Sequence, residues 1–195
     1  MLLLLSALEE QFSKAKSVDD GLIERIKHGD MDAFRNLYEI ASSGVYGFAL
    51  SILNNTHDAE DVLQDTFLTV HKSVSTYTSM GKPMAWIFTI TRNHAMMRLR
   101  EKKRDNEFEE IQNLADEENS SLCRIEDAEN RMLIELLMTT LESEERQIVM
   151  LHASAGLKNR EIASLLELPL NTVLSKYHRA IKKLRTAAEK EGLFK

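Results

Sequence analysis

The sequence predicts an all-α protein: two small helical domains joined by an acidic linker, with a helix-turn-helix at the end of the second domain. Apolar residues recur at spacings of three and four along most of the chain, which is the period of an amphipathic helix. Only seven glycines and two prolines interrupt the 195 residues. Between the two helical stretches, residues 105–129 hold ten Asp or Glu and one Arg without a clear period, which is typical of a linker.

The first domain is predicted to comprise residues 19–104, after an N-terminal tail of residues 1–18. Four helices are expected in it, because each of four apolar stripes follows a residue that favours a helix start. Residues 73–81 are predicted to form a loop, and Pro83 suits the first turn of the fourth helix. The expected caps of the first three helices are, in chain order, Asp19 or Asp20, Asp30, and Thr56 or Asp58.

The linker is predicted to end at residue 127, so that the second domain comprises residues 128–195. Ser143 is expected to cap a helix that stops at Gly156. A helix-turn-helix should follow over residues 158–186, where Ala163 lets two helices cross closely and Val173 is the apolar wedge between them.

The turn of this motif is predicted at Leu168-Pro169, because the residue before a proline is pushed away from helical angles. Asn171 or Thr172 is expected to cap the helix after it. Glu167 lies where such turns often use glycine at positive φ, a conformation that costs other residues about 1–2 kcal/mol. We therefore expect the turn to be adjusted around Glu167.

Charge is distributed in a pattern that favours nucleic-acid binding despite a formal net charge of −6. Residues 92–104 and residues 171–190 each hold six Lys or Arg and one Glu, a net charge of +5. The acidic stretch at 105–129 carries −9. Two basic segments separated by an acidic one suit two contacts with DNA and a linker that avoids it.

Other classes of protein find little support. Cys123 is the only cysteine, which fits a reducing cytosol and offers no cysteine-based metal cluster. The apolar start at Leu2–Leu5 is cut short by Glu9 and Glu10, so neither a signal peptide nor a membrane insertion is expected. No nucleophile–base pair and no phosphate loop is visible. We expect a cytoplasmic protein that is not an enzyme and holds no metal or cofactor.

Three blocks, in order, resemble the extracytoplasmic-function (group 4) sigma factors of bacterial RNA polymerase. Asp58–Phe67 (DAEDVLQDTF) is similar to their polymerase-binding helix, and Pro83–Asn93 (PMAWIFTITRN) to the helix that melts and reads the promoter. Leu157–Arg185 is similar to their promoter-binding helix-turn-helix. The resemblance implies promoter-specific transcription initiation by a sigma factor whose region 2 and region 4 are the two predicted domains.

The resemblance also implies the partners. Region 2 would bind the clamp helices of the beta-prime subunit of core RNA polymerase and open the minus-ten element of promoter DNA. Region 4 would dock on the minus-thirty-five element and on the flap of the beta subunit. An anti-sigma factor would control the protein.

Candidate site residues follow from these blocks and from their chemistry. Polymerase contacts are expected at three polar residues on one helix face, since their spacing is i, i+3 and i+4: Asp61, Gln64 and Asp65. Contacts with melted or duplex DNA are expected in the first domain at Tyr77, Lys82, Trp86, Arg92, Asn93, Met96 and Arg98. Those in the second domain are Thr172, Ser175, Lys176, His178, Arg179, Lys182 and Lys183.

Two alternatives remain open on the sequence alone. A stand-alone helix-turn-helix regulator would bind duplex DNA by itself, but it would leave residues 58–67 and 83–104 without a role. A helical enzyme would need a catalytic group that the chain does not show. For Trp86, stacking on a base and filling the core are both open, and the neighbouring Ile87 and Ile90 favour the core.

Overall fold

The computed structural model describes residues 18–79, 81–108 and 138–190. Within these ranges every regular element is a helix, so the predicted all-α class is confirmed. Most of the N-terminal tail, most of the linker and residues 128–137 of the second domain lie outside the described residues. The helices of the first domain are α2 (Asp20–Lys27), α3 (Met31–Leu53), α4 (Thr56–Ser73), the 3₁₀ helix η2 (Val74–Thr76) and α5 (Pro83–Phe108).

Polar caps set the starts of these helices. The Asp19 carboxylate accepts a hydrogen bond from the Leu22 amide at 2.8 Å, and Asp30 accepts one from the Ala33 amide at 2.9 Å. The third cap was predicted wrongly: Asn55 caps α4 by accepting from the Asp58 amide at 3.0 Å. The preceding Asn54 takes a left-handed conformation that ends α3, so both asparagines act at this boundary.

Two boundaries in the first domain also differ from the prediction. The segment expected to be a loop begins with the 3₁₀ helix Val74–Thr76, whose Val74 is buried. The fourth helix runs to Phe108 instead of ending at Arg104. Residues 105–108 contain no glycine or proline, so nothing in their backbone stops the helix once it has formed.

The second domain contains α7 (Ser143–Ala155), α8 (Asn159–Leu166) and α9 (Leu170–Lys190). Its helix starts lie one to three residues before those predicted. Glu142, not Ser143, is the cap of α7, and its amide donates to the Glu145 carboxylate at 3.3 Å. Neither Asn171 nor Thr172 caps α9, because Pro169 offers its carbonyl to the Thr172 amide at 2.9 Å and the helix already begins at Leu170.

The turn of the helix-turn-helix keeps the strained conformation instead of adjusting it. Glu167 has φ of 59°, and its amide donates to the Ser164 carbonyl while the Leu168 amide donates to that of Ala163 at 3.0 Å. Ala163 and Val173 are both buried, which confirms the predicted crossing of α8 and α9. The motif therefore has the geometry of a helix-turn-helix despite the unusual turn residue.

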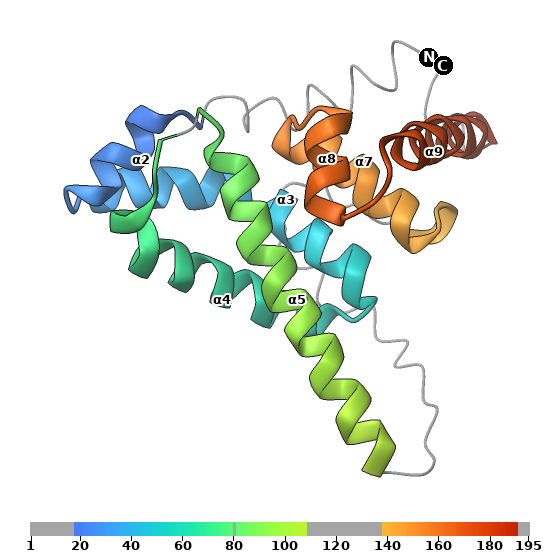
Figure 1. The fold of residues 1–195 in the computed structure, drawn as a ribbon, viewed down its shortest axis with the longest axis horizontal. Helices are drawn as coiled ribbons and strands as arrows, with labels where there is room; N and C mark the ends of the chain where they lie inside the picture. Colours follow the sequence, from blue (N-terminus) through green and yellow to red (C-terminus); the bar gives the residue numbers. More distant parts are fainter. Residues whose placement is uncertain (1–17, 80, 109–137, 191–195) are drawn as a thin grey trace.

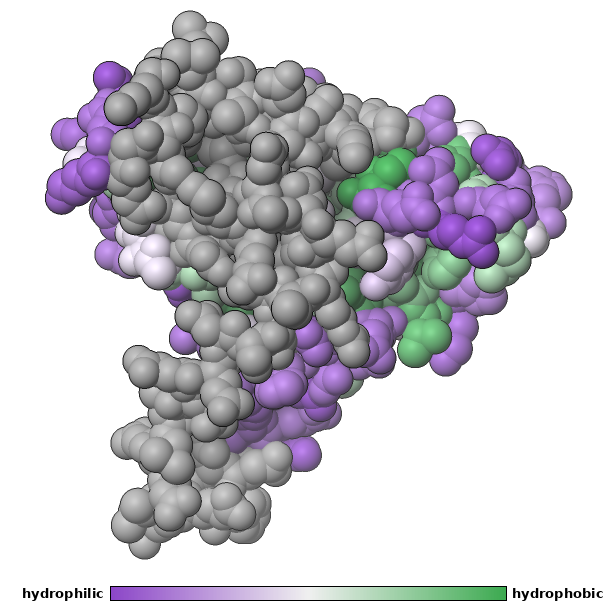
Figure 2. Space-filling view, turned by 180° about the vertical axis from the view of Figure 1, so that it is seen from behind, coloured by the Kyte–Doolittle hydropathy of each residue, from purple (hydrophilic) through white to green (hydrophobic). Residues whose placement is uncertain are grey.

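Both domains contribute to one continuous hydrophobic core. Phe48 and Phe88 of the first domain are fully buried, as are Ile148 and Leu151 of α7, and all four belong to the same cluster. α7 lies against α3, while the far end of α5 projects away from the other helices (Figure 1). From behind, hydrophilic side chains are visible toward the lower part of the view, and hydrophobic areas appear among hydrophilic ones on the side of α2, α3 and α4 (Figure 2).

A glycine permits the close approach of the two domains. A Cβ atom added to Gly44 of α3 would lie 2.6 Å from Cβ of Ser154 on α7 and 3.5 Å from the Phe88 ring. Ser143 adds a polar contact by donating to the Ser51 carbonyl at 3.0 Å. The two domains thus pack through α3 and α7 with complementary surfaces.

Candidate polymerase and nucleic-acid interface

The predicted polymerase contacts lie together on the exposed face of α4. Asp61, Gln64 and Asp65 are all exposed, as their spacing predicts. Leu68 continues the same face and is 56% exposed. It was not among the predicted contacts, although its spacing of three and four from Asp65 and Gln64 places it on their face. The face combines two carboxylates, an amide and an apolar side chain.

Arg98 of α5 is held against this face. Its guanidinium pairs with Asp61 and lies 3.7 Å from the carboxylate of Asp58. Lys102, one turn further along α5, also pairs with Asp58. The structure therefore places Arg98, which was predicted to contact DNA, beside the predicted polymerase contacts.

Tyr77 and Trp86 pack on each other where the loop meets α5. Their ring centroids are 4.8 Å apart, and Lys27 of α2 places its ammonium 5.9 Å from the centre of the Tyr77 ring. Tyr77 is 8% exposed and Trp86 is partly buried against the core. This placement favours the core alternative for Trp86, and it keeps the Tyr77 ring away from the surface in this conformation.

The other predicted DNA contacts of the first domain lie along α5 and just before it. Asn93 and Lys82 are exposed, while Arg92 and Met96 are half-buried. Both cations of this set meet acidic residues of the helix-turn-helix: Lys82 pairs with Glu161, and Arg92 lies 3.3 Å from the carboxylate of Glu167. The Lys82 ammonium, with a further hydrogen bond from the Lys158 amide, lowers the pKa of Glu161 below its ordinary value.

The second helix of the helix-turn-helix, α9, divides its predicted contacts between two sides. Ser175, His178, Arg179 and Lys182 are exposed, and Thr172 is partly buried. Lys176 and Lys183 are turned toward α7, which the sequence did not reveal. Lys176 lies 2.9 Å from the Glu144 carboxylate and Lys183 lies 2.7 Å from that of Glu145.

Glu145 is the buried partner in this contact, with a side chain only 1% exposed. Burial raises the pKa of the Glu145 carboxyl, but the hydrogen bond from Lys183 and a second from the Glu142 amide outweigh it and hold the pKa below its ordinary value. The hydrogen bond to Glu145 also raises the pKa of the Lys183 ammonium. Lys183 is therefore a structural cation in this conformation.

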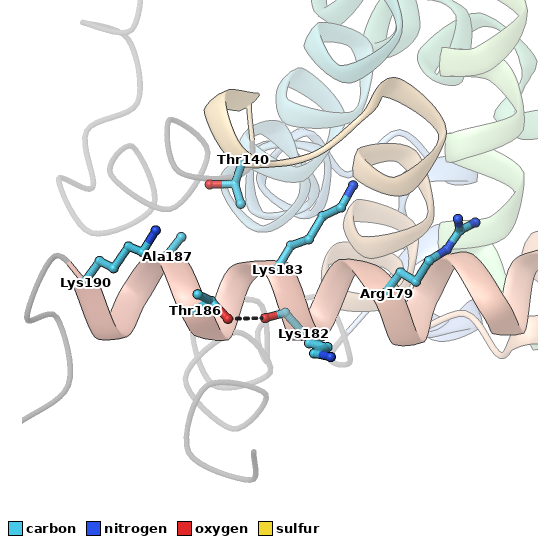
Figure 3. A pocket seen from close by; sticks show the side chains of 7 residues that line it. All are labelled: Thr140, Arg179, Lys182, Lys183, Thr186, Ala187 and Lys190. Carbon is cyan, nitrogen blue, oxygen red and sulfur yellow. Dashed lines mark hydrogen bonds between the residues drawn. The ribbon is translucent and has the colours of Figure 1, made fainter.

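A basic groove of about 510 Å³ lies beside the C-terminal half of α9. Figure 3 shows Arg179, Lys182, Lys183 and Lys190 along α9, with Thr140 nearby on the segment before α7. Thr186 donates to the Lys182 carbonyl at 3.1 Å, so its hydroxyl is used within the helix. Lys183 is held by Glu145, which leaves Arg179, Lys182 and Lys190 as the cations of this groove that suit a phosphate backbone.

No three His, Cys, Asp or Glu side chains of residues 18–79, 81–108 and 138–190 come together as a metal site. None of the helices over those residues is both long and apolar enough to cross a membrane.

Comparison with known families covers both domains. The family described as "Sigma-70 region 2" matches residues 37–105, and "Sigma-70, region 4" matches residues 131–184, in the same order and with the acidic segment between them. This chain belongs to the extracytoplasmic-function sigma factors. The sigma factor binds core RNA polymerase and promoter DNA and directs promoter-specific transcription initiation.

Curated relatives of this sigma factor extend over nearly its whole length. It is 27% identical over 174 residues to the ECF RNA polymerase sigma factor SigW of Bacillus subtilis, covering 84% of this chain and 92% of SigW. It is 28% identical over 175 residues to SigK of Mycobacterium tuberculosis H37Rv, covering 87% of this chain and 93% of SigK.

Solved structures show the same fold. The sigma factor RpoE of Bartonella quintana, in complex with the anti-sigma factor NepR, has a TM-score of 0.57 at 21% identity, covering 80% of this sigma factor and 96% of the other chain. CnrH, in complex with the cytosolic domain of CnrY, has a TM-score of 0.53 at 23% identity, covering 87% and 96%.

Proposed function

We propose that residues 19–104 of this sigma factor form region 2, residues 105–127 the linker and residues 128–195 region 4. Region 2 binds polymerase through α4 and opens the minus-ten element through α5, and region 4 binds the minus-thirty-five element through α9. The observation that carries this assignment is the presence, on one chain, of an exposed acidic helix face and two exposed basic helices. The protein acts in the cytoplasm and without catalysis.

The α4 face meets the clamp helices of the beta-prime subunit. Its exposed Asp61 and Asp65 carboxylates suit basic residues on a partner, and Leu68 offers an apolar contact beside them. An interface that combines an apolar centre with charged edges is typical of stable protein–protein contacts. Asp61 pairs with Arg98 in this conformation, so it contacts polymerase only if that ion pair is replaced by one across the interface.

Asn93 is the candidate reader of an unpaired base. Its side chain is exposed on α5, and an amide can both donate to and accept from a base edge. Arg92 precedes it on the same helix and Lys82 lies just before the helix start, and both cations suit the phosphates of the melted strand. Region 4 places the exposed Ser175, His178 and Arg179 of α9 in the major groove. The basic groove beside them contacts the phosphates. Helices α7 to α9 also lie near the flap of the beta subunit.

The packed arrangement of the two regions must open before they bind a promoter. Arg92 and Glu167 are 3.3 Å apart here. Their DNA targets, the minus-ten and minus-thirty-five elements, are separated by about 25 base pairs, or roughly 85 Å of duplex. In the packed form, the DNA-facing cations Lys82 and Arg92 are neutralised by Glu161 and Glu167. Polymerase binding would supply the free energy that separates them.

Control by an anti-sigma factor fits the same arrangement. The sigma factor RpoE was solved with the anti-sigma factor NepR, and CnrH was solved with the cytosolic domain of CnrY. A comparable partner of this chain would hold regions 2 and 4 in a form that cannot reach both promoter elements. A stand-alone regulator is the less economical alternative, because it leaves the exposed α4 face and Asn93 without a role.

The reading role of Asn93 is tested by permanganate footprinting of promoter complexes made with core polymerase. Asn93→Ala should slow the appearance of reactive thymines in the melted region, while the mutant still co-purifies with core polymerase and protects the minus-thirty-five element. Footprints unchanged in rate and extent would remove Asn93 from the reading role.

A further inference from the structure

The carboxylate of Asp20 on α2 forms hydrogen bonds with the loop that precedes α5. Asp20 accepts a hydrogen bond from the Tyr77 hydroxyl at 2.8 Å, one from the Ser79 hydroxyl, and one from the Gly81 amide at 2.9 Å. These three donors are separated from Asp20 by 57, 59 and 61 residues, so the contacts are tertiary. No motif in the sequence marked Asp20 for this role.

The three hydrogen bonds use both oxygens of the carboxylate. Oδ1 accepts from Tyr77, and Oδ2 accepts from Ser79 and from Gly81. Hydrogen bonds to an ionised acceptor are stronger than neutral ones. Ser79 first, and then Tyr77, lower the pKa of the Asp20 carboxyl, which keeps it ionised at neutral pH.

Two of the three donors lie on the exposed part of the loop. Ser79 and Gly81 are exposed, and Gly81 has φ of 67°, which suits a turn rather than a helix. The buried ring of Tyr77 then transmits the position of the loop to α5, because it packs on Trp86. Asp20 therefore fixes where the loop stands relative to the helix that carries Asn93.

We propose that Asp20 is a positioning residue for base reading: it holds the loop in the one conformation that forms, together with α5, the surface for an unpaired base. The proposal rests on the reading role proposed for Asn93 of α5 and on the predicted DNA contacts Tyr77 and Lys82 in and beside the loop. A binding site that is populated only part of the time binds more weakly by that fraction, so a loosened loop lowers discrimination between bases.

Substitution of Asp20 by asparagine tests these three hydrogen bonds with almost no change in side-chain size. An amide offers one acceptor oxygen and an NH₂ group in place of the second. The hydroxyls of Tyr77 and Ser79 can rotate to accept from that group, but the Gly81 amide can only donate. The single amide oxygen must therefore serve Gly81, and as a neutral acceptor it binds more weakly than the carboxylate. Asp20→Asn should weaken the hydrogen bond to Gly81, and Asp20→Ala should release all three donors.

The matched control is Asp32→Asn. Like Asp20, Asp32 is an aspartate in the first turn of a helix, α3, and its exposed carboxylate pairs with Arg35 at 3.4 Å. Asp20→Glu keeps the charge and both oxygens on a longer side chain, and it should recover part of what Asp20→Asn loses.

The first measurement is amide hydrogen exchange of the full-length protein, followed at Gly81. Asp20→Asn should raise the exchange rate of this amide, and Asp20→Ala, which removes the acceptor, should raise it by about tenfold or more, whereas Asp32→Asn should not. Equal exchange in Asp20→Ala and the wild type would show that the hydrogen bonds of Asp20 do not hold the loop in solution.

The second measurement is base preference at each unpaired position, from rates of open-complex formation by holoenzyme on promoters randomised in the minus-ten element. Asp20→Asn should lower the preference at one or two positions on the order of tenfold, with unchanged affinity for core polymerase. An equal loss at every position would indicate a merely structural role and overturn the proposal.

The two claims fail differently. A wild-type holoenzyme that shows no preference for any unpaired base would overturn the reading role of the loop and α5, and the positioning role with it. A wild type that discriminates, beside an Asp20→Asn variant that discriminates equally well, would overturn only the assignment of Asp20.

Discussion

Arg92 on the promoter-reading helix and Glu167 in the turn of the helix-turn-helix face each other at 3.3 Å across the junction of the two regions. The pair joins a proposed minus-ten contact to the motif that binds the minus-thirty-five element. Glu167 is 77% exposed, so the ion pair contributes little to stability, about 0–1 kcal/mol. The left-handed backbone of Glu167, by contrast, costs conformational free energy that a glycine at this position would not.

Glu167→Gly should therefore stabilise the folded chain. Relief of the positive φ is worth about 1–2 kcal/mol, which exceeds the lost ion pair, so we expect a melting temperature higher by about 2–4 °C. Glu167→Ala is the control, because it removes the same ion pair and keeps the strained backbone. Calorimetry that found no gain for glycine over alanine would show that the turn is not strained at this position.

Gly44→Ala should act in opposite directions on the packed and open forms. Within α3, alanine is about 1 kcal/mol more favourable than glycine. Across the junction, however, its Cβ would lie 2.6 Å from that of Ser154, an overlap that costs about 1–3 kcal/mol. We expect the mutant to populate the open form, with a larger radius of gyration in small-angle scattering.

Ser154→Gly in the Gly44→Ala background is the compensating variant, since it removes the Cβ atom that the alanine meets. It should restore the compact scattering profile. A Gly44→Ala protein as compact as the wild type would mean that α3 and α7 do not pack in solution as they do here.

The sequence predicted elements better than it predicted their contacts. The helix-turn-helix followed from Ala163, Pro169 and Val173, because local spacing and backbone restrictions specify that motif. Two helix caps, Asn55 and Glu142, differ from the predicted ones, because several adjacent polar residues can each serve as a cap. Boundaries decided by such near-equal alternatives are the least predictable part of a helix.

The site was predictable to the extent that it depends on one helix. Asp61, Gln64 and Asp65 are exposed together, as helical spacing requires. The ion pairs of Arg92 with Glu167 and of Lys183 with Glu145 were not foreseen, because they join helices whose relative placement depends on packing rather than on local pattern. Asp20 was missed for the same reason.

The α4 face should be needed for binding to polymerase. Replacing Asp61, Gln64 and Asp65 by alanine should weaken affinity for core polymerase by about tenfold or more, because interface carboxylates leave their partners unpaired when they are removed. The change should leave helicity intact, since all three side chains are exposed.

A control of the same composition is available on α3, where Asp32, Asn36 and Glu39 are also exposed. Their replacement by alanine should leave affinity for core polymerase unchanged. If both triple mutants bind as tightly as the wild type, α4 is not the docking helix.

Arg179→Ala should weaken binding to a matched minus-thirty-five duplex by about 1–3 kcal/mol and relax the preference at one or two base pairs. Arg179 is exposed beside Ser175 and His178, whereas Lys176 is already paired with Glu144 at 2.9 Å. Lys176→Ala should therefore cost less affinity. Binding measured across a salt series on matched and mismatched duplexes separates the two roles, and a uniform loss for Arg179→Ala would make it a phosphate contact.

Stability should fall in acid partly through Glu145. Its pKa is lower in the folded chain than the ordinary value of 4.5, so its contribution is present above that pH and is lost as the pH falls through the folded pKa. Glu145→Gln should give a shallower decline in stability below about pH 4.5. Urea unfolding at pH 3 to 7 measures this slope, and identical slopes in mutant and wild type would remove Glu145 from the account.

The account as a whole is tested by transcription with purified core polymerase on a library of promoter sequences. Core polymerase alone should give no specific initiation, and addition of the protein should start transcripts at a defined distance from shared minus-ten and minus-thirty-five elements. Reading of two elements requires both regions on one polymerase, which distinguishes a sigma factor from a stand-alone regulator. Transcripts that start without sequence preference, or none beyond those of core polymerase, would contradict the account.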